Sequence, residues 1–121
     1  MKTLTEEAMK ALGEMRPALV ATASREGRPN VSAKGSIRVL DEKSVAFADV
    51  ASPRTVANLR ENPRVSILCI DAAQHHSCRI WGTAEVLTSG PLFDELSREL
   101  AGRSMVVKNV VKVTVEECEL S

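Results

Sequence analysis

Residues 44–70 constrain the fold of this chain more than any other stretch. The segment contains two short apolar runs, residues 45–50 and 65–70, and the second is rich in β-branched side chains. Runs of this length and composition are typical of buried strands. Between them, Ser52 is a favourable N-cap residue, and Pro53 suits the first helical position because its missing N–H needs no partner there. The segment therefore predicts a strand, a short helix and a second strand.

The start of this predicted helix carries an unusual set of side chains. Two hydroxyls, Ser52 and Thr55, flank the guanidinium of Arg54 in the first turn. A cation is favoured at the other end of a helix, where the macrodipole is negative. A bound anion such as a phosphate would reverse this preference, since the backbone N–H groups there have no partners. The alternative is an ordinary capped helix with Arg54 in water, and the local sequence leaves both interpretations open.

Residues 30–40 alternate between apolar and polar side chains, which predicts one strand with two different faces. One face carries Val31, Ala33, Gly35, Ile37 and Val39, and the other carries Ser32, Lys34, Ser36 and Arg38. We expect the apolar face to lie in the core. The polar face is either solvated or supplies a second set of phosphate contacts. Gly35 in mid-strand suggests a bulge or a close approach by a ligand.

The remaining segments predict a mainly β domain with peripheral helices (an α+β chain). We expect helices at residues 5–15 and 91–101, strands at 18–23, 78–87 and 105–115, and a hairpin turn at 25–29. Trp81 falls on the polar face of its strand, which suggests edge packing, a ligand wall or a subunit interface. The acidic residues Glu116, Glu117 and Glu119 would form a charged tail. Six strands and few helices predict an antiparallel barrel or sandwich, and we expect residues 1–121 to form a single domain.

Charge and composition narrow the functional classes. Lys+Arg and Asp+Glu both number 16, and aromatic residues make up 2% of the chain. This balance argues against a nucleic-acid-binding protein, which needs a cationic surface and stacking platforms. No apolar run reaches the length of a membrane span. Three widely spaced cysteines without a C-x-x-C motif favour a reduced, cytoplasmic protein.

The familiar catalytic signatures are missing from the sequence. It has no Walker loop, no G-x-G-x-x-G and no G-x-S-x-G nucleophile elbow. Both histidines, His75 and His76, fall in one polar connection close to Cys78. Such a cluster without a distant ligand pair is weak evidence for a metal, so we expect an exposed loop and no metal site. If the protein performs chemistry, a bound cofactor supplies it.

Several segments, taken together and in order, resemble the pyridoxamine 5'-phosphate oxidase-like, flavin mononucleotide (FMN)-binding split-barrel family. The resemblance covers roughly residues 5–120. It rests on Arg28-Pro29-Asn30-Val31, Lys34-Gly35-Ser36, residues 38–41, Phe47-Ala48-Asp49, Ser52-Pro53-Arg54-Thr55, Asn58-Leu59, residues 61–65 and residues 79–85. The length also resembles the small dimeric FMN-binding proteins of that superfamily. The resemblance implies a six-stranded antiparallel split β-barrel.

The same resemblance implies residue roles around an FMN cofactor. Arg54 and Thr55 would grip the phosphate with help from Ser52, while Lys34, Ser36 and also Arg38 would face the phosphate and ribityl chain. The Ala33–Gly35 backbone would lie along the isoalloxazine ring, and Ala48 and Asp49 would border it. The flavin would sit between the two subunits of a homodimer. Arg79, Trp81 and Asn109 are the residues that the partner subunit would add to the site.

Two departures from the family pattern affect the expected activity. The chain ends at Ser121 without the basic, histidine-containing C-terminal segment that holds the substrate in pyridoxamine 5'-phosphate oxidases. Pro53 replaces one of the consecutive basic residues at the helix start. We therefore expect an FMN-dependent oxidoreductase or electron-transfer protein that is not a pyridoxamine 5'-phosphate oxidase itself. The alternatives are a non-catalytic flavin or phosphorylated-ligand carrier or sensor, and a deazaflavin in place of FMN. The sequence does not identify the electron donor or acceptor.

Overall fold

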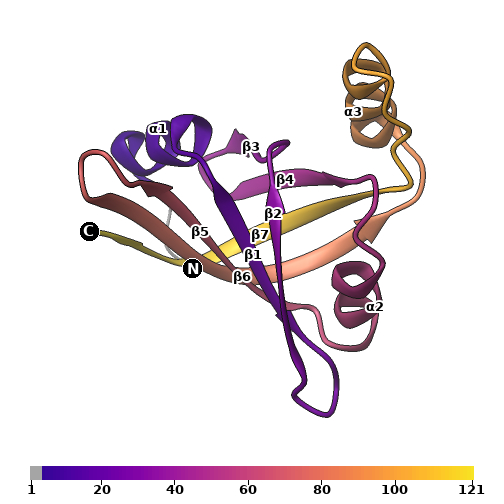
Figure 1. Ribbon diagram of the computed structural model, residues 1–121, viewed down its shortest axis with the longest axis horizontal. Coiled ribbons are helices and arrows are strands. Elements are labelled where there is room, and N and C mark those ends of the chain that lie inside the picture. The colour runs from indigo at the N-terminus through magenta and orange to yellow at the C-terminus, as the bar shows by residue number, and fades with distance from the viewer. Residues whose placement is uncertain (1–3) are drawn as a thin grey trace.

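The computed structural model describes residues 4–121 and shows three helices around one sheet (Figure 1). The helices are α1 (Glu6–Glu14), α2 (Pro53–Glu61) and α3 (Pro91–Ala101). The strands are β1 (Ala18–Ala23), β2 (Pro29–Lys34), β3 (Arg38–Asp41), β4 (Ser44–Asp49), β5 (Arg64–Asp71), β6 (His76–Leu87) and β7 (Asn109–Leu120). No helix within these residues is long and apolar enough to cross a membrane.

All strand pairs are antiparallel, and the sheet has the order β2-β1-β5-β6-β7-β4-β3. β2 and β3 follow one another in the chain yet form the two opposite edges, so residues 35–37 cross the gap between the edges. The sheet therefore curls into a barrel that does not close, which confirms the split-barrel prediction. It has seven strands rather than six because the single strand predicted at residues 30–40 is broken into β2 and β3.

The predicted orientation of this region is wrong for β2. Lys34 and Ser32 pair with Ala18 and Val20 of β1, which are fully buried, so the polar side chains lie on the inner face of the barrel. Val31 lies on the outer face and is 63% exposed. The orientation changes at the break, where Ile37 turns inward and is buried. A pattern of period two distinguishes two faces without saying which one meets the core.

Two apolar clusters lie on the two sides of β4, whose six residues are all buried. Val45 and Phe47 belong to the main cluster, which fills the barrel and receives Leu12 from α1. Ala46 and Ala48 point the other way and pack against Leu96, Leu100, Val107 and Val110 in a second cluster beneath α3. Helix α3 thus covers the outer side of β4, while α1 closes one end of the barrel (Figure 1).

The C-terminal strand differs from its prediction. β7 begins at Asn109 rather than Met105, and it includes the residues expected to form a charged tail. Glu117 and Glu119 pair with Trp81 and Arg79 of β6, and a register shift at Trp81/Gly82 accommodates an extra residue of β7. β7 continues beyond its valine-rich segment because the first half of β6 provides backbone partners for residues 117–120. The acidic side chains are exposed and therefore cost little in this strand.

Candidate functional site

A hollow of about 290 Å³ lies where the barrel is split, and we call it the split hollow. It brings together residues from the β2–β3 break, the β4–α2 connection and the end of α3. Six of the nine residues predicted from the sequence line it: Ala33, Lys34, Gly35, Ser36, Ala48 and Ser52. These residues come from segments separated in sequence, so the structure brings most of the predicted set to one place.

Lys34 is the unusual residue of this hollow. Its side chain is only 7% exposed, and its ammonium donates a hydrogen bond to the hydroxyl of Ser52. The ammonium also lies 5.6 Å from the centre of the Phe47 ring, within the range of a cation–π contact. Within residues 4–121, no carboxylate lies at ion-pair distance from Lys34. Burial lowers the pKa of Lys34, and the more distant Asp49 carboxylate raises it in part.

The start of α2 uses its polar residues differently from the prediction. Ser52 occupies the N-cap position, but its side chain makes no capping hydrogen bond and accepts one from Lys34 instead. Asp49 is buried: its Oδ1 accepts the backbone N–H of Ser52 at 2.8 Å, and its Oδ2 accepts the amide of Asn109 at 2.8 Å. Asp49 therefore shapes the turn into α2 and does not line the split hollow.

The other two residues predicted at the helix start lie outside the split hollow. Thr55 is 1% exposed, and its hydroxyl is 2.8 Å from that of Ser32 and accepts the Asn30 amide at 3.3 Å. Arg54 is exposed and lines a neighbouring hollow of about 220 Å³ with Arg28 and Asn30. Thr55 therefore fastens α2 to the polar inner face of β2, and Arg54 presents its charge on the adjacent surface.

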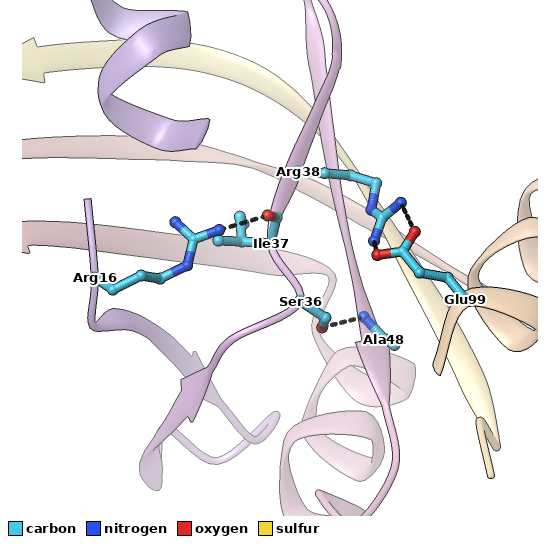
Figure 2. Close-up of polar contacts among 6 residues, drawn as sticks. All are labelled: Arg16, Ser36, Ile37, Arg38, Ala48 and Glu99. Carbon is cyan, nitrogen blue, oxygen red and sulfur yellow. Dashed lines mark hydrogen bonds and ion pairs between the residues drawn. The ribbon is translucent and has the colours of Figure 1, made fainter. Parts of the chain in front are cut away.

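Three side-chain contacts hold the break between β2 and β3 in place (Figure 2). Arg16, which follows α1, donates to the carbonyl of Ile37 at 2.9 Å. The Ser36 hydroxyl accepts the backbone N–H of Ala48 at 2.9 Å, and Arg38 forms two hydrogen bonds, of 2.7 and 2.8 Å, with the Glu99 carboxylate of α3. The hydroxyl of Ser36 and the backbone N–H of Ala48 are thus paired with each other. Arg38 is directed to α3.

Several residues around the site were not predicted. Arg103 and Met105, after α3, line the split hollow, and nothing in the local sequence indicates that they reach it. Asn30 and Ser32 could have been predicted, because they belong to the same polar row of residues 30–38 as Lys34. A larger hollow of about 870 Å³ lies between α1 and the β5–β6 turn, away from all nine predicted residues. We choose the split hollow as the candidate site because of the buried charge of Lys34 rather than because of its volume.

Comparison with known proteins identifies the family. A family model described as pyridoxamine 5'-phosphate oxidase matches residues 4–121, and the chain therefore belongs to this family. A relative from Methanocaldococcus jannaschii, the uncharacterized protein MJ0282, is 39% identical over 92 residues. That match covers 72% of this chain, which spans only 58% of the relative's length.

Solved structures support the same fold. The HupZ protein from Group A Streptococcus is 28% identical, with a TM-score of 0.88 and coverage of 97% of this chain and 93% of HupZ. An FMN-binding protein from Syntrophomonas wolfei gives a TM-score of 0.83 over 94% of this chain and 86% of that protein. At 14% identity, this second likeness shows the fold alone.

Proposed function

We propose that this protein binds FMN in the split hollow, with the phosphate held by Lys34, and that it acts in flavin redox chemistry. The observation that carries the proposal is the buried ammonium of Lys34 without a counter-ion in the described residues. A buried charge is costly unless it is paired and hydrogen-bonded. An anionic ligand supplies both, because two of the three ammonium donors remain beyond the bond to Ser52.

The helix start adds donors for the same anion. Pro53 has no N–H, and the backbone N–H of Ser52 is used by Asp49. The N–H groups of Arg54 and Thr55 have no acceptor among residues 4–121, as expected in the first turn of a helix. They carry the positive end of the α2 dipole. A phosphate at this place would therefore meet a fixed ammonium and backbone donors, which is a favourable environment for a dianion.

The hollow also offers walls for a planar ring system. Ala33 and Gly35 line it at the β2–β3 break, and Ala48 and Met105 add apolar residues to the lining. Bound FMN would supply the hydride or electron chemistry, and the chain would contribute position, charge and exclusion of water. The resemblance to FMN-binding split barrels and the name of the Syntrophomonas wolfei protein support this choice of ligand. A cytoplasmic location remains part of the proposal.

We further propose that the working form is a homodimer with the flavin at the subunit interface. The outer faces of β1 and β2 expose a mostly apolar surface around Val31, which is next to Ala21 and Ala33. Trp81 is half-buried. It lies on the same outer side of the sheet as Ala21, because Trp81 is paired with Ser66 of β5, and Ser66 is paired with Ala21 of β1. Contiguous apolar surface of this kind marks interaction sites.

The phosphate assignment is tested by titrating FMN and riboflavin, followed by flavin fluorescence. Lys34→Met should weaken FMN binding by about 1.5–3 kcal/mol, roughly 10- to 100-fold, while riboflavin affinity stays unchanged. Arg54→Ala should weaken FMN less, because Arg54 is exposed and lines the neighbouring hollow. Lys43→Met, which removes an exposed lysine, is the matched control. Equal FMN affinity in Lys34→Met and the parent would overturn the assignment.

A second measurement separates redox chemistry from simple binding. Mass spectrometry of the small molecule released on denaturation identifies FMN, a deazaflavin or another phosphorylated ligand. Bleaching of the flavin bands by reduced nicotinamide, followed by recovery with an electron acceptor, would support an oxidoreductase. A bound flavin that no reductant bleaches would instead support the carrier or sensor.

A further inference from the structure

The three cysteines, widely spaced in sequence, form a row across three neighbouring strands. Cys69 of β5 is paired with Cys78 of β6, and Cys118 of β7 is paired with Ile80, which lies on the same face of β6 as Cys78. Cys69 and Cys78 are buried, and Cys118 is partly exposed. The sulfurs of Cys78 and Cys118 are 3.8 Å apart, which is close to contact between two thiols.

Cys118 lies two residues away from Leu120, the direct partner of Cys78, so the two cysteines are diagonal neighbours in the sheet. This position determines how strained a disulfide between them would be. Diagonal Cα atoms in a sheet are about 7–8 Å apart, whereas disulfides join Cα atoms about 4.4–6.8 Å apart. A bond therefore requires a small backbone shift. The end of β7 allows one, because its contact with the β3–β4 hairpin ends at Val115, whose N–H donates to the Lys43 carbonyl, and residues 116–120 pair only with β6.

We propose that Cys78 and Cys118 are a modification site at which a peroxide forms an intramolecular disulfide. In the first step the Cys118 sulfur attacks one oxygen of hydrogen peroxide, the O–O bond breaks, and a sulfenic acid and one water result. In the second step the Cys78 sulfur attacks the Cys118 sulfur, and the hydroxyl leaves as water with the proton of Cys78. Two electrons pass from the two thiols to the peroxide.

The burial of each thiol assigns these roles. Cys118 is reached first because it is the partly exposed member of the pair. Burial and the adjacent Cys118 raise the pKa of Cys78 to about 12, so Cys78 is a neutral thiol at pH 7 and suits the slower second step. Because the bond is strained, we expect glutathione to reduce it readily, unlike a permanent structural disulfide.

The test compares the parent protein with single cysteine variants after treatment with hydrogen peroxide. In the parent, intact-mass spectrometry should show the loss of two hydrogen atoms per chain. Protease digestion should then link the peptide containing Cys118 to residues 65–79. Cys78→Ala and Cys118→Ser should both abolish this link. Cys69→Ala is the matched control and should keep it, which excludes a bond to the other cysteine of the same peptide.

Three outcomes would overturn the proposal. They are a sulfinic acid on Cys118 without a link, a disulfide between two chains, and loss of the link in Cys69→Ala. The Cys118→Ser variant keeps the test valid if Cys78→Ala fails to fold, because Cys118 lies at the surface end of β7. The experiment measures only sulfur chemistry, so its result is independent of whether the split hollow binds FMN.

Discussion

β2 and β6 both alternate between apolar and polar side chains, but the two strands turn opposite rows toward the inside of the barrel. In β6 the apolar row is inside, with Cys78 and Ile80 fully buried and Arg79 exposed. In β2 the polar row is inside, with Lys34 buried and Val31 exposed. The difference lies in what each inner face meets. β6 faces the apolar filling of the barrel, while β2 faces the polar start of α2.

This comparison shows why a polar row can be placed inside a barrel. A buried hydroxyl or amide is tolerated when it has a hydrogen-bond partner. α2 supplies such partners to β2 through Thr55 and Ser52. The inner face of β2 thus contributes to the proposed binding site, while that of β6 is part of the core. Three pairs of variants test this contrast.

The largest expected effect concerns the two glycines in these predicted strands. A Cβ added at Gly82 of β6 would lie 2.3 Å from the carbonyl oxygen of Thr114, which is backbone and cannot move aside easily. A Cβ at Gly35, in the break after β2, would meet no atom within 4 Å. Gly82→Ala should therefore lower the free energy of unfolding by about 2–4 kcal/mol.

Gly35→Ala should change the free energy of unfolding by less than about 0.5 kcal/mol. Urea denaturation followed by circular dichroism measures both variants. Equal losses in the two variants would show that residues 35–37 are packed as tightly as β6. FMN titration of Gly35→Ala adds a second result, since the new methyl group would enter the split hollow and should weaken binding.

The next effect concerns the hydroxyl that joins α2 to β2. Thr55→Val keeps the shape of the side chain but leaves the partly buried polar groups of Ser32 and Asn30 without this partner. The expected loss is about 1–3 kcal/mol of unfolding free energy. Thr83→Val on the exposed face of β6 is the control and should change stability by less than about 0.5 kcal/mol.

A double variant sharpens this prediction. Combining Ser32→Ala with Thr55→Val removes both hydroxyls, so the total loss should be smaller than the sum of the single losses. Strictly additive losses, measured by urea denaturation, would mean that the two hydroxyls do not stabilise each other.

The smallest effect on the folded subunit concerns the outer face of β2. Val31→Glu changes a side chain that is already 63% exposed, so the stability of one subunit should change by less than about 0.5 kcal/mol. If the outer face forms the proposed dimer interface, the same change should convert dimer to monomer in sedimentation experiments. Val106→Glu, at a residue that is 76% exposed outside the sheet, is the control and should leave the dimer intact.

Much of the architecture could be predicted because it depends on local chemistry. Short apolar runs indicated β4 and β5, and Pro53 marked the first residue of α2. The leucines of α3 have helical spacing, and two of them, Leu96 and Leu100, are buried. These signals lie within a few residues of one another. The predictions made from them agree with the structure because they depend on neighbouring residues rather than on contacts with distant elements.

The sequence by itself therefore determined the helices, most strands and six of the residues that line the split hollow. Only the tertiary structure decided which face of β2 is inside, where residues 30–40 break, and that Arg54 and Thr55 lie outside the split hollow while Arg103 and Met105 line it. The physical reason is that strand periodicity is a property of the backbone. Orientation and site membership depend on hydrogen-bond partners supplied by elements far away in the chain, here α2 and α3.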